Sequence, residues 1–242
     1  MAERPLRIAA TADLHYGKHS RGTLHDAFAE ISRSADILLL CGDLTDYGLP
    51  EEAEELVADI RAAVRIPILA VLGNHDFESS QPETISKVLD DAGVNVLNGE
   101  AIEIGGVGFA GIAGFGGGFG RRMLNAWGES LIKQFVQESI SHAVRLEQAL
   151  GKLQTEKRIV VLHYSPIRAT LEGEDPEIYA FLGSSRLEEP INRFKVTAVF
   201  HGHAHNGILD GRTSTGIPVY NVSAPALRKT GKPYRIVELS GV

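Results

Sequence analysis

The sequence of 242 residues has a single cysteine and no long apolar run. Because Cys41 has no partner in the chain, no intrachain disulfide can form, and we expect a reducing, cytoplasmic setting. Residues 1–17 contain no apolar run of signal-peptide length, and no segment reaches the ~18 apolar residues that a membrane span needs. The sequence therefore predicts neither a disulfide framework nor a membrane association.

Basic residues are also few, with 24 Lys and Arg against 31 Asp and Glu, so the formal net charge is −7. Nucleic-acid binders usually carry a basic face, and we therefore expect a small-molecule partner instead. An apolar share of 43% is enough for a sizeable core. Since the sequence shows no linker and no internal repeat, we expect one domain over residues 1–242, while the oligomeric state stays open.

Apolar segments of strand length alternate with segments of helical periodicity, a pattern typical of α/β proteins. Strands are expected at 6–11, 36–40, 66–72, 158–162 and 195–200, with shorter ones within 94–109 and 208–239. Helices are expected at 23–33, 51–64, 82–92, 129–154 and 185–194. In the longest of these, Ile132, Val136, Ile140 and Ala143 form the stripe that is predicted to face the core.

Five of the expected strands end in residues that can bind a metal or transfer a proton. These residues are Asp13 and His15, Asp43, Asn74 and His75, His163, and His203 and His205. Ligands of open α/β sheets bind at the carboxyl ends of strands, so we expect these loops to converge on one site. Five of the nine histidines lie at these ends, whereas core or surface histidines would be scattered.

The types of these side chains indicate a metal centre. Histidine and carboxylate ligands without thiolates suit Mn, Fe, Co, Ni or Zn. The seven candidate ligands, which are these residues without His75, are too many for one tetrahedral ion and fit two ions that share a carboxylate. Two divalent ions with a bridging hydroxide would leave the site with a net positive charge, which attracts a phosphate ester and stabilises its transition state.

The ordered motifs Asp-x-His, Gly-Asp-x-x-Asp, Gly-Asn-His-Asp, His and Gly-His-x-His resemble those of the calcineurin-like metallophosphoesterase superfamily. They span positions 13 to 205. The resemblance implies an α/β fold, a four-layer αββα sandwich of two mixed β-sheets flanked by helices. It also implies a dinuclear metal-dependent phosphoesterase in which a metal-bridging hydroxide attacks the phosphate ester.

The resemblance also implies a role for each motif residue. The first ion would have the ligands Asp13, His15, Asp43 and His205. The second would have Asp43 as a bridge, with Asn74, His163 and His203. His75 would act beside the metals, where an unligated imidazole can protonate a leaving oxygen near neutral pH, and Asn74 would help to stabilise the transition state.

Two departures narrow the expected activity. Where the protein phosphatases of this superfamily carry phosphate-binding arginines, this chain has Tyr47 and Leu72. Asp76 in place of Glu is shared with cyclic-nucleotide phosphodiesterase-like members. We therefore expect a small phosphodiester substrate. The alternatives are a phosphomonoesterase, a nuclease of the same superfamily, or a phosphoesterase fold retained as a protein-binding scaffold.

The remaining candidates are assigned structural roles or left open. Asp46 is expected to hold its loop, and His201 to be a hydrogen-bonded core residue. The other three histidines, His19, His25 and His142, are expected on the surface or on a helix face. Two loops could contact the substrate or remain solvated: 114–127, which carries Arg121 and Arg122, and 164–182, which is rich in acidic residues.

Overall fold

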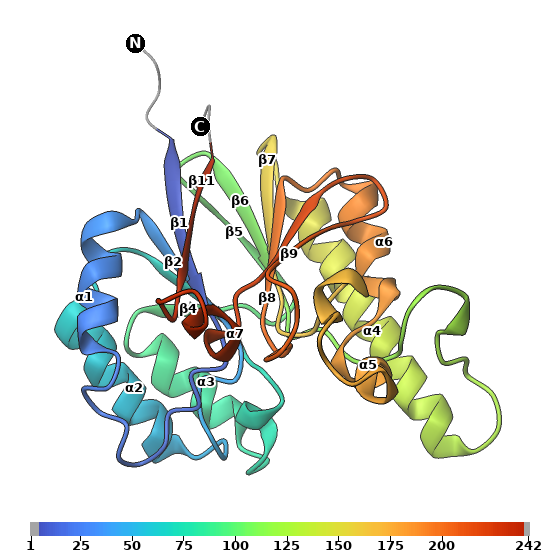
Figure 1. Ribbon diagram of the computed structural model, residues 1–242, viewed down its shortest axis with the longest axis horizontal. Helices are drawn as coiled ribbons and strands as arrows, with labels where there is room; N and C mark the ends of the chain where they lie inside the picture. The colour runs from blue at the N-terminus through green and yellow to red at the C-terminus, as the bar shows by residue number, and fades with distance from the viewer. Residues whose placement is uncertain (1–4, 240–242) are drawn as a thin grey trace.

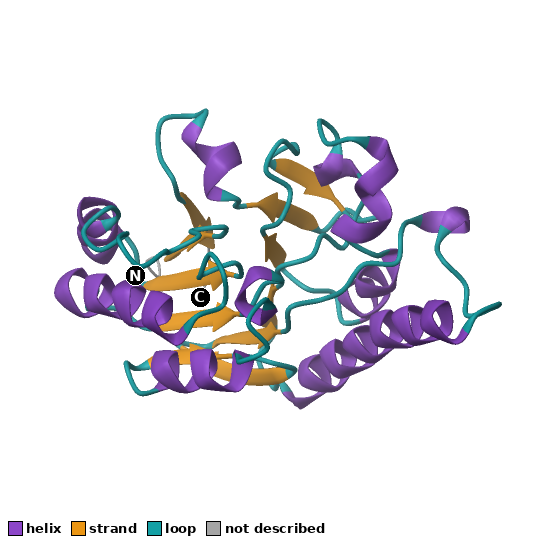
Figure 2. Ribbon diagram, turned by 90° about the horizontal axis from the view of Figure 1, so that it is seen from below, coloured by secondary structure: helices purple, strands orange, loops and turns teal. Residues whose placement is uncertain are grey.

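Two β-sheets pack face to face, and helices cover the outer face of each, which gives the four-layer αββα arrangement that Figures 1 and 2 show. The structure is a computed structural model that describes residues 5–239. Both sheets are mixed, as the resemblance implied: the first is parallel except for one antiparallel edge strand, and the second has a parallel centre with an antiparallel strand at each edge.

The first sheet has the strand order β11-β1-β2-β3-β4. Its strands are β1 (Leu6–Thr11), β2 (Ile37–Cys41), β3 (Ile68–Val71), β4 (Val94–Val96) and β11 (Arg235–Leu239). Strands β1 to β4 are parallel, and β11 runs antiparallel beside β1. The helices that pack on its outer face are α1 (His25–Ser34), α2 (Pro50–Ala63) and α3 (Pro82–Asp90). Acidic residues in the first turn of α2 complement the helix dipole.

The second sheet has the strand order β5-β6-β7-β8-β10-β9. Its strands are β5 (Glu100–Ile104), β6 (Val107–Gly111), β7 (Lys157–Val161), β8 (Ala198–His201), β9 (Asp210–Arg212) and β10 (Pro218–Asn221). Helices α4 (Ser130–Lys152) and α6 (Ser185–Arg193) cover its outer face. The short helices α5 (Tyr179–Leu182) and α7 (Ala224–Arg228) lie in connections.

The alternation of side chains along each strand explains why the strands read as continuous apolar runs. In β2, Leu38 and Leu40 pack against the helices, whereas Leu39 packs between the two sheets. In β7, Val160 faces α4 and α6, and Val161 faces the other sheet. Both faces of each central strand are therefore buried, and each such side chain contributes about 1.5–3 kcal/mol to folding.

Two sequence-based expectations need correction. The predicted stripe of α4 is wrong in phase, because Ile132 is 43% exposed and only Val136 of the four residues is fully buried. The buried face runs instead through His142, Leu146 and Ala149, since the first turns of α4 extend past the strands (Figure 2). Residues 208–239 were expected to form several strands around turns, and they contain β9, β10 and β11 but also α7, which was not expected.

Among residues 5–239, we find no helix with the combination of length and apolar character that crossing a membrane demands.

Candidate metal centre

The strand ends named above meet at one place in the fold. Asp13, Asp43 and Asn74 follow β1, β2 and β3, which are neighbouring parallel strands of the first sheet. His163 follows β7, and the segment with His203 and His205 follows β8, the next strand of the second sheet. Since the carboxyl ends of both sets of strands lie at the same edge of the two packed sheets, side chains far apart in sequence come together.

The backbone at this edge is bent into an unusual conformation. Six described residues other than glycine have positive φ, and four of them are candidate ligands: Asp13 (56°), His15 (47°), Asp43 (50°) and His203 (69°). Left-handed backbone is unfavourable for residues with a Cβ, and such strain gathers at functional sites. The free-energy cost of left-handed backbone is thus concentrated at the residues that follow the strands and turn toward the site.

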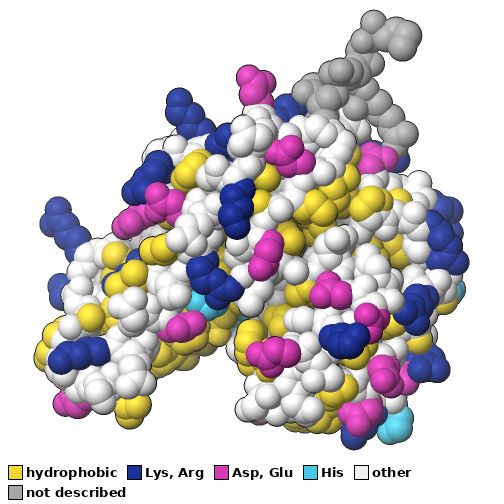
Figure 3. Space-filling model, turned by 180° about the vertical axis from the view of Figure 1, so that it is seen from behind, with side chains coloured by type: hydrophobic (Ala, Val, Ile, Leu, Met, Phe, Trp, Pro, Cys, Tyr) yellow, Lys and Arg dark blue, Asp and Glu magenta, His cyan; other side chains and the backbone are white. Residues whose placement is uncertain are grey.

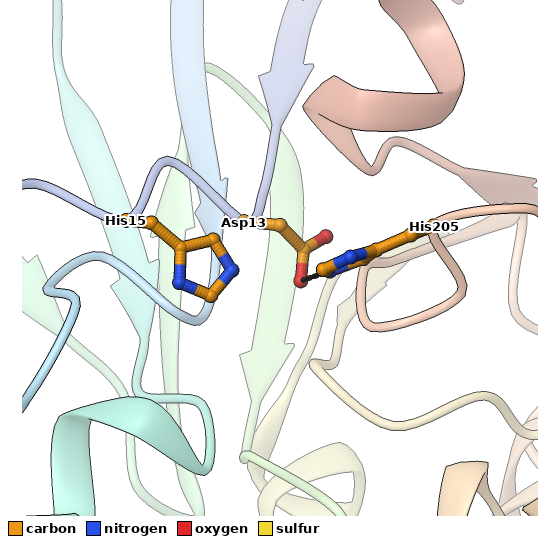
Figure 4. A group of neighbouring side chains, drawn as sticks. All are labelled: Asp13, His15 and His205. Atoms are coloured by element: carbon orange, nitrogen blue, oxygen red, sulfur yellow. Dashed lines mark ion pairs between the residues drawn. The ribbon is translucent and has the colours of Figure 1, made fainter.

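One group of candidate ligands consists of Asp13, His15 and His205, whose ligand atoms all lie within 4.8 Å of one another. Figure 4 shows Asp13 between the two imidazoles, with His205 Nε2 3.2 Å from Asp13 Oδ1. His15 is positioned by Asp46, whose Oδ1 lies 3.4 Å from His15 Nδ1. Asp46 thus contacts a candidate ligand from beside this group, and its loop-holding role stays a prediction.

A second group consists of Asp43, His163 and His203, again within 4.8 Å of one another. His163 is fully buried, and its Nδ1 lies 2.9 Å from the carbonyl oxygen of Cys41. Its Nε2 lies 3.3 Å from Asp43 Oδ1 and 3.0 Å from Asn74 Oδ1. The structure thus brings Asn74 to this group as well.

A third group, formed by His15, Asp43 and His75, connects the other two. The rings of His15 and His75 have centroids 4.5 Å apart in an edge-to-face arrangement. The backbone N–H of His75 donates to Asp43 Oδ1 at 2.9 Å, and His75 Nδ1 lies 2.6 Å from the carbonyl oxygen of Asp46. Because a carbonyl can only accept, Nδ1 carries a proton, and Nε2 is the ring nitrogen left for chemistry.

The donor set fits metal cations. Since Cys41 offers His163 only a carbonyl oxygen, His163 Nδ1 donates, and a neutral ring would turn the lone pair of Nε2 toward Asp43 and Asn74 oxygens. A cation among these three atoms satisfies all of them. His15 Nε2 is likewise buried without a hydrogen-bond partner, 3.9 Å from Asp43 Oδ2. Two ligands at about 2.1 Å from one tetrahedral ion are separated by roughly 3.4 Å, close to these distances.

The pKa shifts of these side chains also favour metal binding. Burial opposes the charge of Asp43, but the adjacent His163 and the His75 N–H hold the pKa of this carboxyl well below its usual range. Burial, with a contribution from His163, lowers the pKa of His203 to about 3, so this ring is neutral and able to bind a metal. Burial would also lower the pKa of His163, but Asp43 outweighs it and raises the pKa to about 9. Metal binding at His163 would therefore release a proton.

Two glycines of the motifs leave room for candidate ligand side chains. A Cβ on Gly73 would overlap the side chain and the backbone nitrogen of Asp43 and would lie 2.8 Å from His163 Cε1. A Cβ on Gly42 would lie within 2.7 Å of the His163 ring and its Cβ, and the φ of +86° at this position also favours glycine. The motif glycines are thus explained by the close approach of the Asp43 and His163 side chains.

Asp76, which sequence reasoning associated with substrate class, has a clear structural role. Its carboxylate is fully buried and accepts hydrogen bonds from the N–H groups of Gly73 (2.8 Å), Leu44 (3.1 Å) and Thr45 (2.8 Å), and from the Thr45 hydroxyl (2.6 Å). It therefore ties the loop after β2 to the loop after β3. Burial and the neighbouring Asp43 raise its pKa.

The other histidines are buried or exposed as expected, with one exception. His201 is buried, with its Nδ1 2.7 Å from the Gly202 carbonyl and its Nε2 2.9 Å from the Thr170 hydroxyl, and His19 and His25 are exposed. His142 was expected on the surface or on a helix face. It does lie on a helix, α4, but it is not at the surface. The ring faces inward from α4, is 8% exposed, and holds Glu138 Oε1 at 3.0 Å.

The two loops left open by the sequence pair with each other. The N–H of Gly117 donates to the carbonyl of Ala180, and that of Gly118 donates to the carbonyl of Gly183. Arg121 and Arg122 lie in an exposed 3-10 turn. The start of the first loop, by contrast, lines a cavity of about 290 Å³ beside Asn74. Sequence reasoning missed the aromatic residues of this cavity because none of them belongs to a motif.

Comparisons with known proteins agree with this architecture. A family model described as calcineurin-like phosphoesterase matches residues 6–207. A probable cyclic nucleotide phosphodiesterase from a Synechococcus species is 26% identical over 189 residues, which cover 76% of this chain and 63% of the relative. The chain thus spans less than two thirds of that relative.

Solved structures show the same fold at low identity. The phosphopantetheinyl hydrolase of Mycobacterium tuberculosis aligns with a TM-score of 0.69 and 14% identity, covering 97% of this chain and 96% of that one. The protein GAP50 of Plasmodium, described as the anchor in the inner membrane complex, aligns with a TM-score of 0.60 and 12% identity, covering 93% and 73%.

Proposed function

The chain belongs to the calcineurin-like phosphoesterase family, and from that premise we propose that it hydrolyses a small phosphodiester at a centre of two divalent metal ions. The observation that carries the proposal is that the carboxylate of Asp43 lies between two groups of candidate ligand atoms, each within 4.8 Å of one another. Its Oδ1 is 3.3 Å from His163 Nε2, in the group completed by His203, and its Oδ2 is 3.9 Å from His15 Nε2, in the group completed by Asp13 and His205. A shared carboxylate between two sets of ligands is the arrangement that a dinuclear centre requires.

In this proposal Asp13, His15, Asp43 and His205 hold one ion, and Asp43, Asn74, His163 and His203 hold the other. The ligand types suit Mn, Fe, Zn, Co or Ni. When bound, such ions supply Lewis-acid activation of the phosphate and of the attacking water. The carbonyl of Cys41 orients the His163 ring, and the carboxylate of Asp46 orients the His15 ring.

His75 is proposed as the catalytic residue that transfers a proton. Its Nδ1 proton is held by the Asp46 carbonyl, so protonation of the ring places the second proton on Nε2. An imidazolium at that position can donate to the oxygen that leaves phosphorus and return to the neutral ring. The side-chain amide of Asn74, directly before it, is proposed to stabilise the charge that develops on the phosphate oxygens.

A diester is favoured over a monoester because two motif positions lack the arginines that would balance the second negative charge of a monoester. A diester phosphate carries one negative charge and a monoester up to two. At the positions where phosphatases of this superfamily carry arginine, Leu72 is buried and Tyr47 is 58% exposed. The match to a probable cyclic nucleotide phosphodiesterase points the same way.

A small-molecule substrate is proposed in preference to a nucleic acid. The net charge is −7, and on the face seen in Figure 3 basic and acidic side chains are interspersed instead of forming a basic stripe. Binding to a nucleic-acid backbone depends on such a stripe. We further propose that the two sheets act as one catalytic domain. The chain supports this because, after it has formed the second sheet, it returns to the first sheet, where β11 pairs with β1.

The test is to compare hydrolysis of bis-p-nitrophenyl phosphate and p-nitrophenyl phosphate by protein stripped of metal and by protein loaded with Mn²⁺. We expect Mn²⁺-dependent turnover, with the diester faster than the monoester. Preference for the monoester would overturn the diester assignment. Absence of turnover of both, in protein shown to hold two ions, would favour a protein-binding scaffold.

A further inference from the structure

The cavity of about 290 Å³ beside the candidate metal centre has walls rich in aromatic side chains. Gly73 and Asn74 form one side, so the cavity begins at the residue proposed to contact the phosphate. Three aromatic side chains, Phe77, Phe115 and Tyr164, form much of the rest. Its volume is close to the lower end of ligand pockets, about 300–1,000 Å³.

The aromatic rings are held in place by their surroundings. The Phe115 ring lies 5.9 Å from the Tyr164 ring and 4.9 Å from the Phe135 ring of α4. Tyr164 in turn lies 4.6 Å from the ring of His203. Phe77 is 45% exposed although it is a large apolar side chain. A partly exposed phenylalanine at the rim of a preformed aromatic cavity is suited to contact a bound ring.

The charge of the cavity restricts what can enter it. Among the described residues that line it, Glu138 has the one formal charge, because burial lowers the pKa of His142 and keeps that ring neutral. Glu138 accepts a hydrogen bond from His142 Nε2, which leaves Nδ1 buried without a partner. A second phosphate or a carboxylate placed here would meet the half-exposed negative charge of Glu138 and, among the lining residues, no cationic side chain.

We propose that this cavity is a specificity subsite that receives an uncharged aromatic group of the substrate while the phosphate lies at Asn74. The inference rests on the proposed function and names the class of ester: one in which an aromatic ring is attached to the phosphate directly or through a short link. Stacking against Phe115 and Tyr164 gives such a ring an advantage over a small alkyl group, which cannot fill the space.

The subsite can be tested by binding, independently of turnover. Isothermal titration calorimetry of the Mn²⁺-loaded protein would compare phenylphosphonate with methylphosphonate, which share the phosphorus group and differ in the ring. We expect phenylphosphonate to bind about fivefold more tightly or better. In Phe115→Ala the two affinities should converge to within about twofold. The matched control Phe119→Ala, on the same loop but outside the cavity, should retain the wild-type ratio.

A third ligand tests the charge argument. We expect 4-carboxyphenylphosphonate to bind more weakly than phenylphosphonate, and Glu138→Gln to reduce that difference. Equal affinities for the phenyl and methyl ligands, or a ratio unchanged in Phe115→Ala, would overturn the subsite, and intact diester turnover would then leave the proposed function standing. Failure of both phosphonates to bind would overturn the phosphate site and the subsite with it.

Discussion

The backbone N–H of His75 donates a hydrogen bond of 2.9 Å to Oδ1 of Asp43. The residue proposed to transfer a proton is thereby fixed to the carboxylate proposed to bridge the two ions. The bond also stabilises the charge on Asp43, which lies 3.3 Å from His163 Nε2. Because the contact uses the backbone of His75, its side chain can be replaced without removing it.

His75→Ala should therefore separate catalysis from metal binding. We expect the variant to retain both ions, measured by elemental analysis, and to lose turnover by about 10²–10⁴-fold, the usual contribution of a general acid. Asp43→Asn should instead lose metal. The control His25→Ala replaces an exposed histidine and should behave as wild type. Wild-type turnover of His75→Ala on every substrate tested would refute its role.

Gly73→Ala should damage the site by steric overlap alone. The added Cβ would overlap Asp43, so we expect loss of metal affinity and a destabilisation of about 1–3 kcal/mol, measured by urea unfolding. Gly17→Ala is a matched control near the same site, because its Cβ would meet only Ser20 Oγ at 3.8 Å. If Gly73→Ala bound metal as tightly as wild type, the explanation of the motif glycine would be wrong.

Metal should stabilise the folded chain. A ligand that binds only the folded state adds about 2.7 kcal/mol at a concentration of 100 times its Kd. We expect Mn²⁺ to raise the melting temperature measured by calorimetry and EDTA to lower it again. In Asp43→Asn the increase should be largely lost. An equal increase in the wild type and in this variant would place the stabilising ions elsewhere.

Asp76→Ala should be strongly destabilising. It leaves the N–H groups of Gly73, Leu44 and Thr45 buried without an acceptor, at about 1–3 kcal/mol each before relaxation. We expect a total loss of at least about 3 kcal/mol in denaturant unfolding. Glu78→Ala, an exposed acidic residue two positions later, should change stability by less than about 0.5 kcal/mol. A small effect at Asp76 would show that water replaces the carboxylate.

His142 should make stability fall at mildly acidic pH. Burial lowers its pKa below the ordinary histidine value of about 6.5, with Arg145 acting in the same direction and Glu138 opposing. The unfolded chain therefore binds a proton that the folded chain does not, and stability decreases as the pH falls through 6.5. In metal-free protein, the loss of unfolding free energy between pH 7.5 and 5.5 should be smaller in His142→Leu than in wild type. Equal losses would contradict the assignment.

Much of the fold could be predicted from local pattern. The strands were expected close to where they lie because, in β2 and β7, both faces are buried and the sequence is continuously apolar. The stripe of α4 was mispredicted because periodicity identifies a helix but not how far it extends past the sheet. Ile132, in the apolar first turns, was predicted to face the core but is 43% exposed.

The sequence by itself determined which residues stand at the strand ends, since a polar motif after a buried strand is a local property. Tertiary structure alone decided which of them meet: that His163 Nε2 faces Asp43 and Asn74, and that His15 and His75 lie edge to face. It also decided that Phe77, Phe115 and Tyr164 form a cavity. These residues come from three separate loops, and their convergence depends on how two sheets and a long helix pack, which no local pattern encodes.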